Sequence, residues 1–155
     1  MIGFLGEYEA TLDLKGRFLL PVGFKKQLPE KDSDLFDINR GFEKCLSLYP
    51  RKSWEPIFEN ISKLNDFDPK VREFRRYFLN GAIMMELDSA GRLLVPQNLK
   101  AYAGLEKDIV LVAAVNKIEI WDKTKYQQFF ESFSPEAFSG LANEVMNNKN
   151  DKLSS

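Results

Sequence analysis

Two arginines occur in the same short motif, and arginine is the side chain best suited to bidentate contacts with phosphate or guanine. The motif Asp-x-x-Gly-Arg begins at Asp13 and returns at Asp88, and a proline stands four residues after each arginine. The offset between the two copies is 75 residues. Because an aspartate and a glycine at this spacing are typical of a tight turn, Arg17 and Arg92 should each leave such a turn in a fixed direction.

The residues around each motif predict two short strands joined by a hairpin turn. Gly16 and Gly91 can adopt the left-handed conformation that such turns commonly require. The predicted strands are residues 7–12 and 17–20 in the first copy and residues 81–87 and 92–95 in the second. Pro21 and Pro96 suit the first turn of a short helix, where the missing backbone N–H is not needed.

A second pair of similar segments extends the repeat into a duplicated unit. Leu46–Tyr49 resembles Ile118–Trp121 at an offset of 72, so the first copy contains three extra residues. We therefore predict an α+β fold with two repeats related by a pseudo-two-fold axis. The expected organisation is repeat 1 (7–54), a helical connector (55–82), repeat 2 (83–126), C-terminal amphipathic helices (127–146) and a disordered polar tail (147–155).

The two arginines have a structural interpretation and a functional one. In the structural interpretation they pair with Asp13 and Asp88 and only fix the turn. A surface ion pair contributes about 0 to 1 kcal/mol, which is a weak reason to repeat so specific a motif. In the functional interpretation the arginines contact DNA, and Lys15, which has no acidic partner in its turn, assists. Ala90 stands at the position that matches Lys15, so the two turns need not bind equally.

Composition excludes most catalytic and metal chemistry. The 155 residues include no histidine, which removes the commonest general base and transition-metal ligand. The single cysteine, Cys45, has apolar neighbours and is interpreted as a small buried side chain. An enzyme would need Asp13 and Asp88 to form a shared carboxylate dyad, but the arginine after each one favours a turn-shaping role. We predict no enzyme activity, no metal and no cofactor.

A separate cluster of arginines lies between the two copies. Arg72, Arg75 and Arg76 share one face of a predicted helix because their spacings are three and four residues. The face is either solvated and paired with acidic residues, or it contributes to a subunit contact or to binding of the DNA backbone.

These motifs resemble the MraZ family of bacterial transcriptional regulators, within the wider group of AbrB-like swapped-hairpin proteins. The resemblance runs from Leu5-Gly6-Glu7-Tyr8 through both turns and their prolines to Ile120-Trp121-Asp122. It implies that the two copies intertwine into one β-barrel unit and that subunits form a homo-oligomeric ring. It also implies binding to short direct repeats in the promoter of the division and cell-wall gene cluster.

Carried over by position, the resemblance assigns DNA contact to Lys15, Arg17 and Arg92. Asp13, Gly16, Asp88 and Gly91 would shape the turns. The expected partners are double-stranded DNA and further copies of the chain, with no membrane partner, because no apolar run approaches the roughly 18 residues of a membrane span. We expect a cytoplasmic, nucleoid-associated protein. The alternative is a structural ring that binds other proteins and not DNA.

Overall fold

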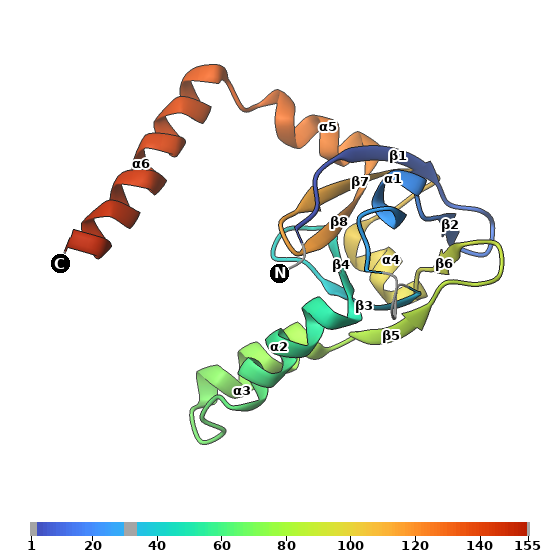
Figure 1. The fold of residues 1–155 in the computed structure, drawn as a ribbon, viewed down its shortest axis with the longest axis horizontal. Helices are drawn as coiled ribbons and strands as arrows, with labels where there is room; N and C mark the ends of the chain where they lie inside the picture. Colours follow the sequence, from blue (N-terminus) through green and yellow to red (C-terminus); the bar gives the residue numbers. More distant parts are fainter. Residues whose placement is uncertain (1–2, 30–33, 155) are drawn as a thin grey trace. The chain divides into compact units, whose positions relative to one another are not determined.

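A computed structural model describes residues 3–29 and 34–154, with side chains placed through residue 147. The fold is mixed α+β (Figure 1). In chain order the elements are β1 (Glu7–Thr11), β2 (Arg17–Leu19), α1 (Val22–Lys25), β3 (Leu35–Arg40), β4 (Leu46–Pro50), α2 (Arg51–Ser62), α3 (Pro69–Leu79), β5 (Ile83–Glu86), β6 (Arg92–Leu94), α4 (Gln97–Ala103), β7 (Asp108–Ala114), β8 (Lys117–Asp122), α5 (Lys123–Glu131) and α6 (Pro135–Ser154).

The chain divides into an N-terminal unit, Met1–Lys123, and a C-terminal unit, Thr124–Ser155. All the strands belong to the N-terminal unit, so both sequence copies lie within it. Among the described residues, no helix combines the length and apolar character needed to cross a lipid bilayer.

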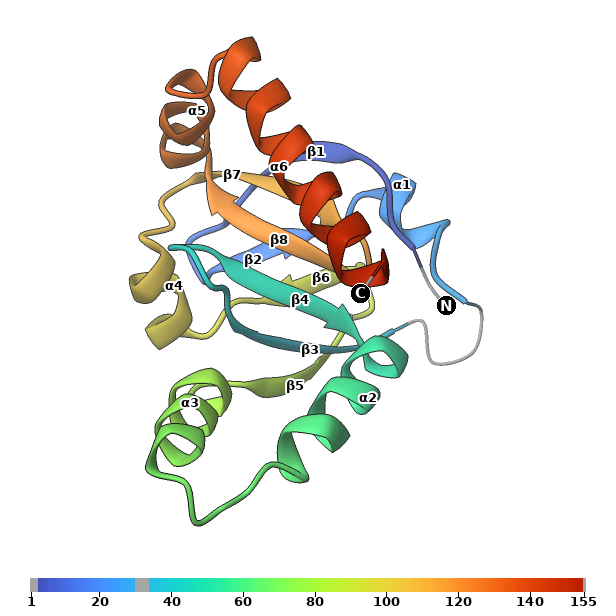
Figure 2. The same ribbon diagram turned by 90° about the vertical axis from the view of Figure 1, so that its left-hand side faces the viewer.

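The strand order shows that the two copies exchange strands. The larger sheet has six strands in the order β1-β7-β8-β4-β3-β5, and β2 pairs with β6 in a separate two-stranded sheet. The first strand of each copy, β1 or β5, therefore pairs with the third strand of the other copy, β7 or β3. Figure 2 shows β8, β4, β3 and β5 running side by side across the N-terminal unit. Neither copy completes its own sheet.

Strand register places a pseudo-two-fold axis through two residue pairs. Phe18 lies opposite Leu93, its own equivalent at the offset of 75. Ser47 lies opposite Glu119, its own equivalent at the offset of 72. In each ladder, the two residue pairs that flank the central pair are related to each other by the same axis. The duplication predicted from the sequence is thus a structural duplication as well.

The three extra residues of the first copy fall in two places. Tyr8 pairs with Leu111, and Ile83, the equivalent of Tyr8 in the second copy, pairs with Ile38. Ile38 and Leu111 are therefore equivalent, so the offset between the copies is 73 in the third strand. Two extra residues therefore lie between the second and third strands, and one lies in the connection from β3 to β4. Both insertions avoid the strands, so the paired registers stay equivalent.

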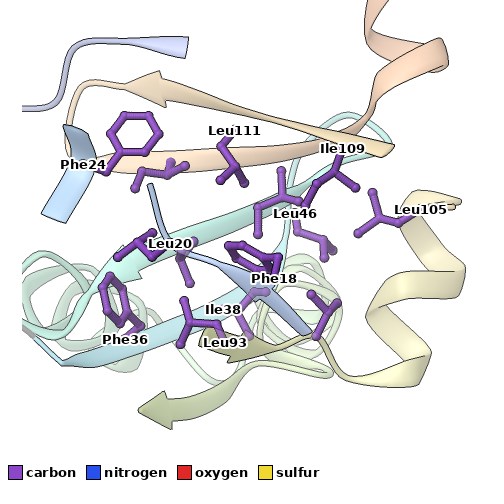
Figure 3. Close-up of a cluster of buried hydrophobic side chains, with 14 of the residues drawn as sticks. Phe18, Leu20, Phe24, Phe36, Ile38, Leu46, Leu93, Leu105, Ile109 and Leu111 are labelled. Atoms are coloured by element: carbon purple, nitrogen blue, oxygen red, sulfur yellow. The ribbon is translucent and has the colours of Figure 1, made fainter. Parts of the chain in front are cut away.

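The hydrophobic core lies between the two sheets. Phe18 and Leu93 point inward from β2 and β6 and are almost completely buried, with 1% and 0% of their surface exposed. Figure 3 shows them among side chains of the larger sheet, of α1 and of the segment that follows α4, including Phe24, Phe36, Ile38, Leu46, Leu105, Ile109 and Leu111. Burial of one face of the short β2–β6 sheet leaves its other face at the surface.

A second apolar cluster joins α2 and α3 to the sheet. Trp54 stacks on Phe78 with ring centroids 6.0 Å apart, and Tyr49 and Ile61 complete the buried group. The predicted amphipathic helices in this connector are confirmed by α2 and α3.

The arginine cluster of α3 is largely engaged within the fold. Arg75 Nη1 forms an ion pair of 2.7 Å with Asp66, and Arg75 Nη2 donates to the Leu64 carbonyl oxygen. Arg72 Nη1 donates to the backbone oxygen of Asp66. These contacts fix the connection between α2 and α3 and favour the acid-paired interpretation for Arg75, whereas Arg72 binds a backbone oxygen.

Three local expectations differ from the structure. The strands beside each turn do not form simple hairpins, because β1 pairs with β7 and β2 pairs with β6. Pro21 and Pro96 occupy the N-cap positions of α1 and α4, one residue before the first turn, where each backbone carbonyl begins the helical hydrogen bonds. The predicted tail from residue 147 is helical through Ser154, because no proline or glycine follows Gly140 to end α6; Ser155 lies outside the described residues.

Candidate nucleic-acid interface

The first turn is organised by the carboxylate of Asp13. Its Oδ1 accepts hydrogen bonds of 2.9 Å from the backbone amides of Lys15 and Arg17. Its Oδ2 accepts a bond of 2.7 Å from Arg17 Nε. The amide of Gly16 donates to the Asp13 carbonyl oxygen, which closes the turn. One carboxylate therefore fixes both the backbone of the turn and the base of the guanidinium group.

The second turn repeats this geometry. Asp88 Oδ1 accepts bonds of 2.9 Å from the amides of Ala90 and Arg92, and Asp88 Oδ2 accepts a bond of 2.9 Å from Arg92 Nε. The amide of Gly91 donates to the Asp88 carbonyl oxygen. The repeated motif in the sequence thus corresponds to a repeated hydrogen-bond network.

The same networks set the ionisation of the two aspartates. The backbone amide of Arg17 is the largest of the influences that lower the pKa of Asp13 from 3.8 to about 2. The backbone amide of Arg92 likewise lowers the pKa of Asp88. A carboxylate dyad that shares a proton would instead raise one of the two pKa values. Asp13 and Asp88 are therefore ionised turn residues, and this geometry contradicts the catalytic alternative.

The ion pairs occupy only one edge of each guanidinium group. Within the described part of the chain, the hydrogen bonds of Arg17 and Arg92 all involve Nε or the backbone, so the Nη1 and Nη2 atoms keep their donors for an external ligand. The side chains of Arg17 and Arg92 are 28% and 35% exposed. The structural and functional interpretations are thus compatible, because one edge fixes the turn and the other remains open.

Pairing of β2 with β6 brings both arginines to one surface. Arg17 lies opposite Leu94, and Arg92 lies opposite Leu19. Since directly opposed residues point to the same side of a sheet, these four side chains form one face, which we call the β2–β6 outer face. Figure 1 shows β2 and β6 side by side, with both turns extending from the right-hand side of the strands.

Glycine is required in each turn by the backbone. Gly16 and Gly91 have φ values of 88° and 79°, which L side chains rarely adopt. The carbonyl oxygen of Gly16 accepts a bond from the Val95 amide, and that of Gly91 accepts a bond from the Leu20 amide. Each turn is therefore tied to the second strand of the other copy.

The surroundings of the two turns differ in charge. A groove of about 600 Å³ lies beside the first turn, and its lining includes two lysines, Lys100 and Lys107, and two acids, Glu106 and the turn residue Asp13. The Lys107 carbonyl accepts a bond from the Leu12 amide, and in the second copy the carbonyl of Asp34 accepts the equivalent bond from Leu87. A lysine beside the first turn is therefore replaced by an aspartate beside the second. With Ala90 in place of Lys15, the first turn has the more positive surroundings.

Lys100 and Lys107 were missed by sequence reasoning. Both belong to the second copy, about 90 residues from the first turn along the chain, and they reach it because β1 pairs with β7. No local sequence pattern marks them. Their position could have been predicted only from the exchange of strands between the copies.

One group of potential metal ligands occurs among the described residues. The Cys45 thiol and carboxylate oxygens of Glu43 and Glu119 lie within 4.8 Å of one another. Burial, together with the carboxylates of Glu119 and Glu43, raises the pKa of Cys45 to about 12, so the thiol is protonated at neutral pH. Trp121 Nε1 donates to Glu119 at 3.1 Å. A buried, protonated thiol matches the small apolar side chain that the sequence predicts.

Fold and surface together define a binding protein. Its outer face presents two oriented guanidinium groups, and its repeated carboxylates are held ionised as parts of turns. The donors of such a face suit contact with an anionic or hydrogen-bonding partner.

Comparison with known proteins identifies the family. The family described as "MraZ protein, putative antitoxin-like" matches residues 3–77 and again residues 78–148. The chain is 45% identical to the transcriptional regulator MraZ of Christiangramia forsetii over 149 residues, 96% of each chain. It is 45% identical to the protein of that name from Flavobacterium psychrophilum over 148 residues, covering 95% of this chain and 94% of the relative. The MraZ of Cytophaga hutchinsonii is 43% identical over 143 residues, covering 92% and 94% respectively.

The chain therefore belongs to the MraZ family. The names of these relatives make it a transcriptional regulator and not an enzyme, as the sequence predicts. The two family matches correspond to the two copies that the strand exchange joins.

Proposed function

We propose that this regulator binds double-stranded DNA through the β2–β6 outer face and the two turns beside it. Its target would be short direct repeats in the promoter of the division and cell-wall gene cluster, in the cytoplasm at the nucleoid. The observation that carries the proposal is the pair of guanidinium groups on one exposed face, each fixed through Nε with its terminal nitrogens open. Arginine in this form suits bidentate contact with guanine in the major groove.

Phosphate contacts would come mainly from the first turn. Lys15 is exposed and makes no ion pair among the described residues, and Lys100 and Lys107 border the same turn. Lysines bind phosphate as mobile point charges and orient a protein on the duplex without reading its sequence. We therefore expect the first turn to contribute more to affinity than the second.

Assembly would compensate for the low charge of a single chain. The formal net charge is −1, so one subunit has little general attraction to DNA. If copies form a closed ring, several outer faces engage neighbouring repeats together, and such tethering raises affinity by about 10² to 10⁴.

An apolar surface at the sheet edge supports this self-association. Ile83 and Met84 of the edge strand β5 are 49% and 66% exposed. They line a pocket of about 390 Å³ together with Trp54 and Phe58. Exposed apolar surface beside an unpaired strand edge favours contact with another protein surface.

The test begins with selection of bound fragments from the genome of the source organism, which yields a target duplex. Gel shifts then compare the unmodified chain with Arg17→Ala and Arg92→Ala, and light scattering checks the assembly. We expect Arg17→Ala to weaken binding at least several-fold and Arg92→Ala to have a similar or smaller effect, with the assembly intact. Lys52→Ala, which removes one exposed positive charge from α2, is the matched control and should leave binding unchanged.

Salt dependence separates DNA binding from a scaffold function. Each neutralised phosphate contributes about 0.9 to the slope of log affinity against log salt concentration. Lys15→Ala should therefore lower the slope by about one unit. If the selection enriches no sequence, or if DNA affinity changes neither with salt concentration nor on Arg17→Ala substitution, a structural ring that does not bind DNA would be favoured.

A further inference from the structure

Two leucines share the outer face with the arginines, where a purely phosphate-binding surface would have polar residues. The register of β2 and β6 puts Leu19 beside Arg92 and Leu94 beside Arg17. Leu19 is 59% exposed and Leu94 is 53% exposed. Each end of the proposed DNA-binding face therefore carries one apolar and one cationic side chain.

Each leucine is positioned by the turn of the other copy. A Cβ atom added to Gly91 would lie 3.7 Å from Leu19 Cδ1, and one added to Gly16 would lie 3.9 Å from Leu94 Cδ1. The leucines thus rest beside the same glycine turns that orient the arginines. Apolar and cationic groups on this face are held in a fixed relation to one another.

We infer that Leu19 and Leu94 contact the C5-methyl groups of thymine in the major groove, next to the bases that the arginines contact. This inference rests on the proposed function. Thymine is the base that presents a methyl group in that groove, and apolar side chains recognise it. The flanking guanidinium groups supply the charge complementarity that brings this face against a duplex.

The spacing of the face agrees with neighbouring base pairs. Residues placed diagonally across two antiparallel strands, as Arg17 and Arg92 are, lie about 7 to 8 Å apart. Successive phosphates of one DNA strand are about 3.4 Å apart along the helix axis, so the two arginines span roughly two base-pair steps. Leu94 beside Arg17 and Leu19 beside Arg92 would therefore meet bases adjacent to those that the arginines contact.

The experiment replaces thymine by uracil, which removes the methyl group and keeps base pairing. Two selections start from the same random duplex library, one prepared with thymine and the other with uracil. Binding of the selected thymine duplex and its uracil counterpart is then measured by fluorescence anisotropy. We expect the unmodified chain to bind the uracil duplex about three- to fivefold more weakly for each contacted methyl group.

Leucine variants test whether the weaker binding of the uracil duplex arises at the outer face. Leu19→Ala and Leu94→Ala should bind the thymine duplex more weakly, and the double variant should bind both duplexes with equal affinity. Leu5→Ala removes a leucine that is 82% exposed and precedes β1, so it is the matched control and should keep the full preference for thymine. Light scattering and thermal unfolding confirm that each variant folds and assembles.

The outcomes separate this inference from the proposed function. Equal affinity of the unmodified chain for the two duplexes overturns it, as does an equal loss of affinity for both in the leucine variants. A changed assembly size in Leu19→Ala or Leu94→Ala also overturns it, because the face would then join copies of the chain. Failure of the thymine library to yield any bound sequence would contradict the proposed function itself.

Discussion

Replacing Gly91 by alanine tests whether the positive φ of the second turn is a structural requirement. The nearest described atom to a Cβ at this position is Leu19 Cδ1 at 3.7 Å, an ordinary contact distance. A steric clash therefore contributes little, and the cost of Gly91→Ala comes from holding alanine at a φ of 79°. The substitution isolates one physical cause.

The expected magnitude combines two opposing effects. Backbone strain of this kind costs about 1 to 3 kcal/mol. Alanine also lowers the conformational entropy of the unfolded chain relative to glycine, and this offsets about 0.4 to 1 kcal/mol of that cost. We expect Gly91→Ala to lower the free energy of unfolding by about 1 to 2 kcal/mol, which lowers the Tm of a chain of this size by roughly 2 to 8 °C.

Thermal and urea unfolding followed by circular dichroism measure this effect, with two comparison variants. Gly91→Asn is the larger substitution, yet it should cost less than Gly91→Ala because asparagine tolerates the left-handed region. Gly140→Ala should stabilise α6 by up to about 1 kcal/mol, since the added Cβ would meet no described atom within 4 Å beyond its chain neighbours and its own helix backbone. If Gly91→Ala were as stable as the unmodified chain, or more stable than Gly91→Asn, the assigned cause would be wrong.

Three further predictions concern other parts of the N-terminal unit. Burial raises the pKa of Cys45 to about 12, so this thiol should not react with an aromatic disulfide reagent at pH 8 until denaturant unfolds the chain; reaction in the folded state would contradict this. Val115 has a φ of 67° in the turn between β7 and β8, so Val115→Asn should stabilise the protein by about 1 kcal/mol in urea unfolding, and a loss of stability would count against strain there. The carboxyl carbon of Asp13 should titrate in NMR with a midpoint near 2, because its pKa is lowered in the fold; its stabilising effect is then complete above pH 3.8 and lost as the pH falls through about 2, and a midpoint at 3.8 would refute the network.

The sequence predicted the parts of the fold that depend on local chemistry. Each Asp-x-x-Gly-Arg turn closes on itself, because the aspartate side chain reaches amides only two and four residues ahead. Gly104 ends α4 in the left-handed conformation, as its position after the helix predicts. Such contacts need no information from the rest of the chain, so residue type and spacing are sufficient.

Pairing between distant segments was not available from spacing and composition alone. Nothing in the residues near Glu7–Thr11 shows that β7 is their partner, and the resemblance to a family supplied the expectation of intertwined copies. For the same reason the positions of Lys100 and Lys107 beside the first turn could not be predicted. The charge of this surface depends on residues from both copies, which the strand exchange brings together, so neither copy alone predicts it.

The exchange of strands also explains how so small a sheet can present a fixed outer face. Two strands of three residues are not stable by themselves. Here Phe18 and Leu93 anchor the pair in the core, and the carbonyl oxygens of Gly16 and Gly91 bind the chain that continues from the opposite strand. The face is therefore fixed before any ligand arrives.

An ion pair that contributes little to stability can then contribute to recognition. Asp13 holds Arg17 Nε, and Asp88 holds Arg92 Nε, so each guanidinium group has already lost much of its rotational freedom in the unbound protein. Ordering a flexible side chain is one of the costs of association, and a side chain ordered in advance avoids it. Under the proposed function, the aspartates would strengthen DNA binding without touching the DNA, and this would account for the recurrence of the whole motif, and not of the arginine alone, in both copies.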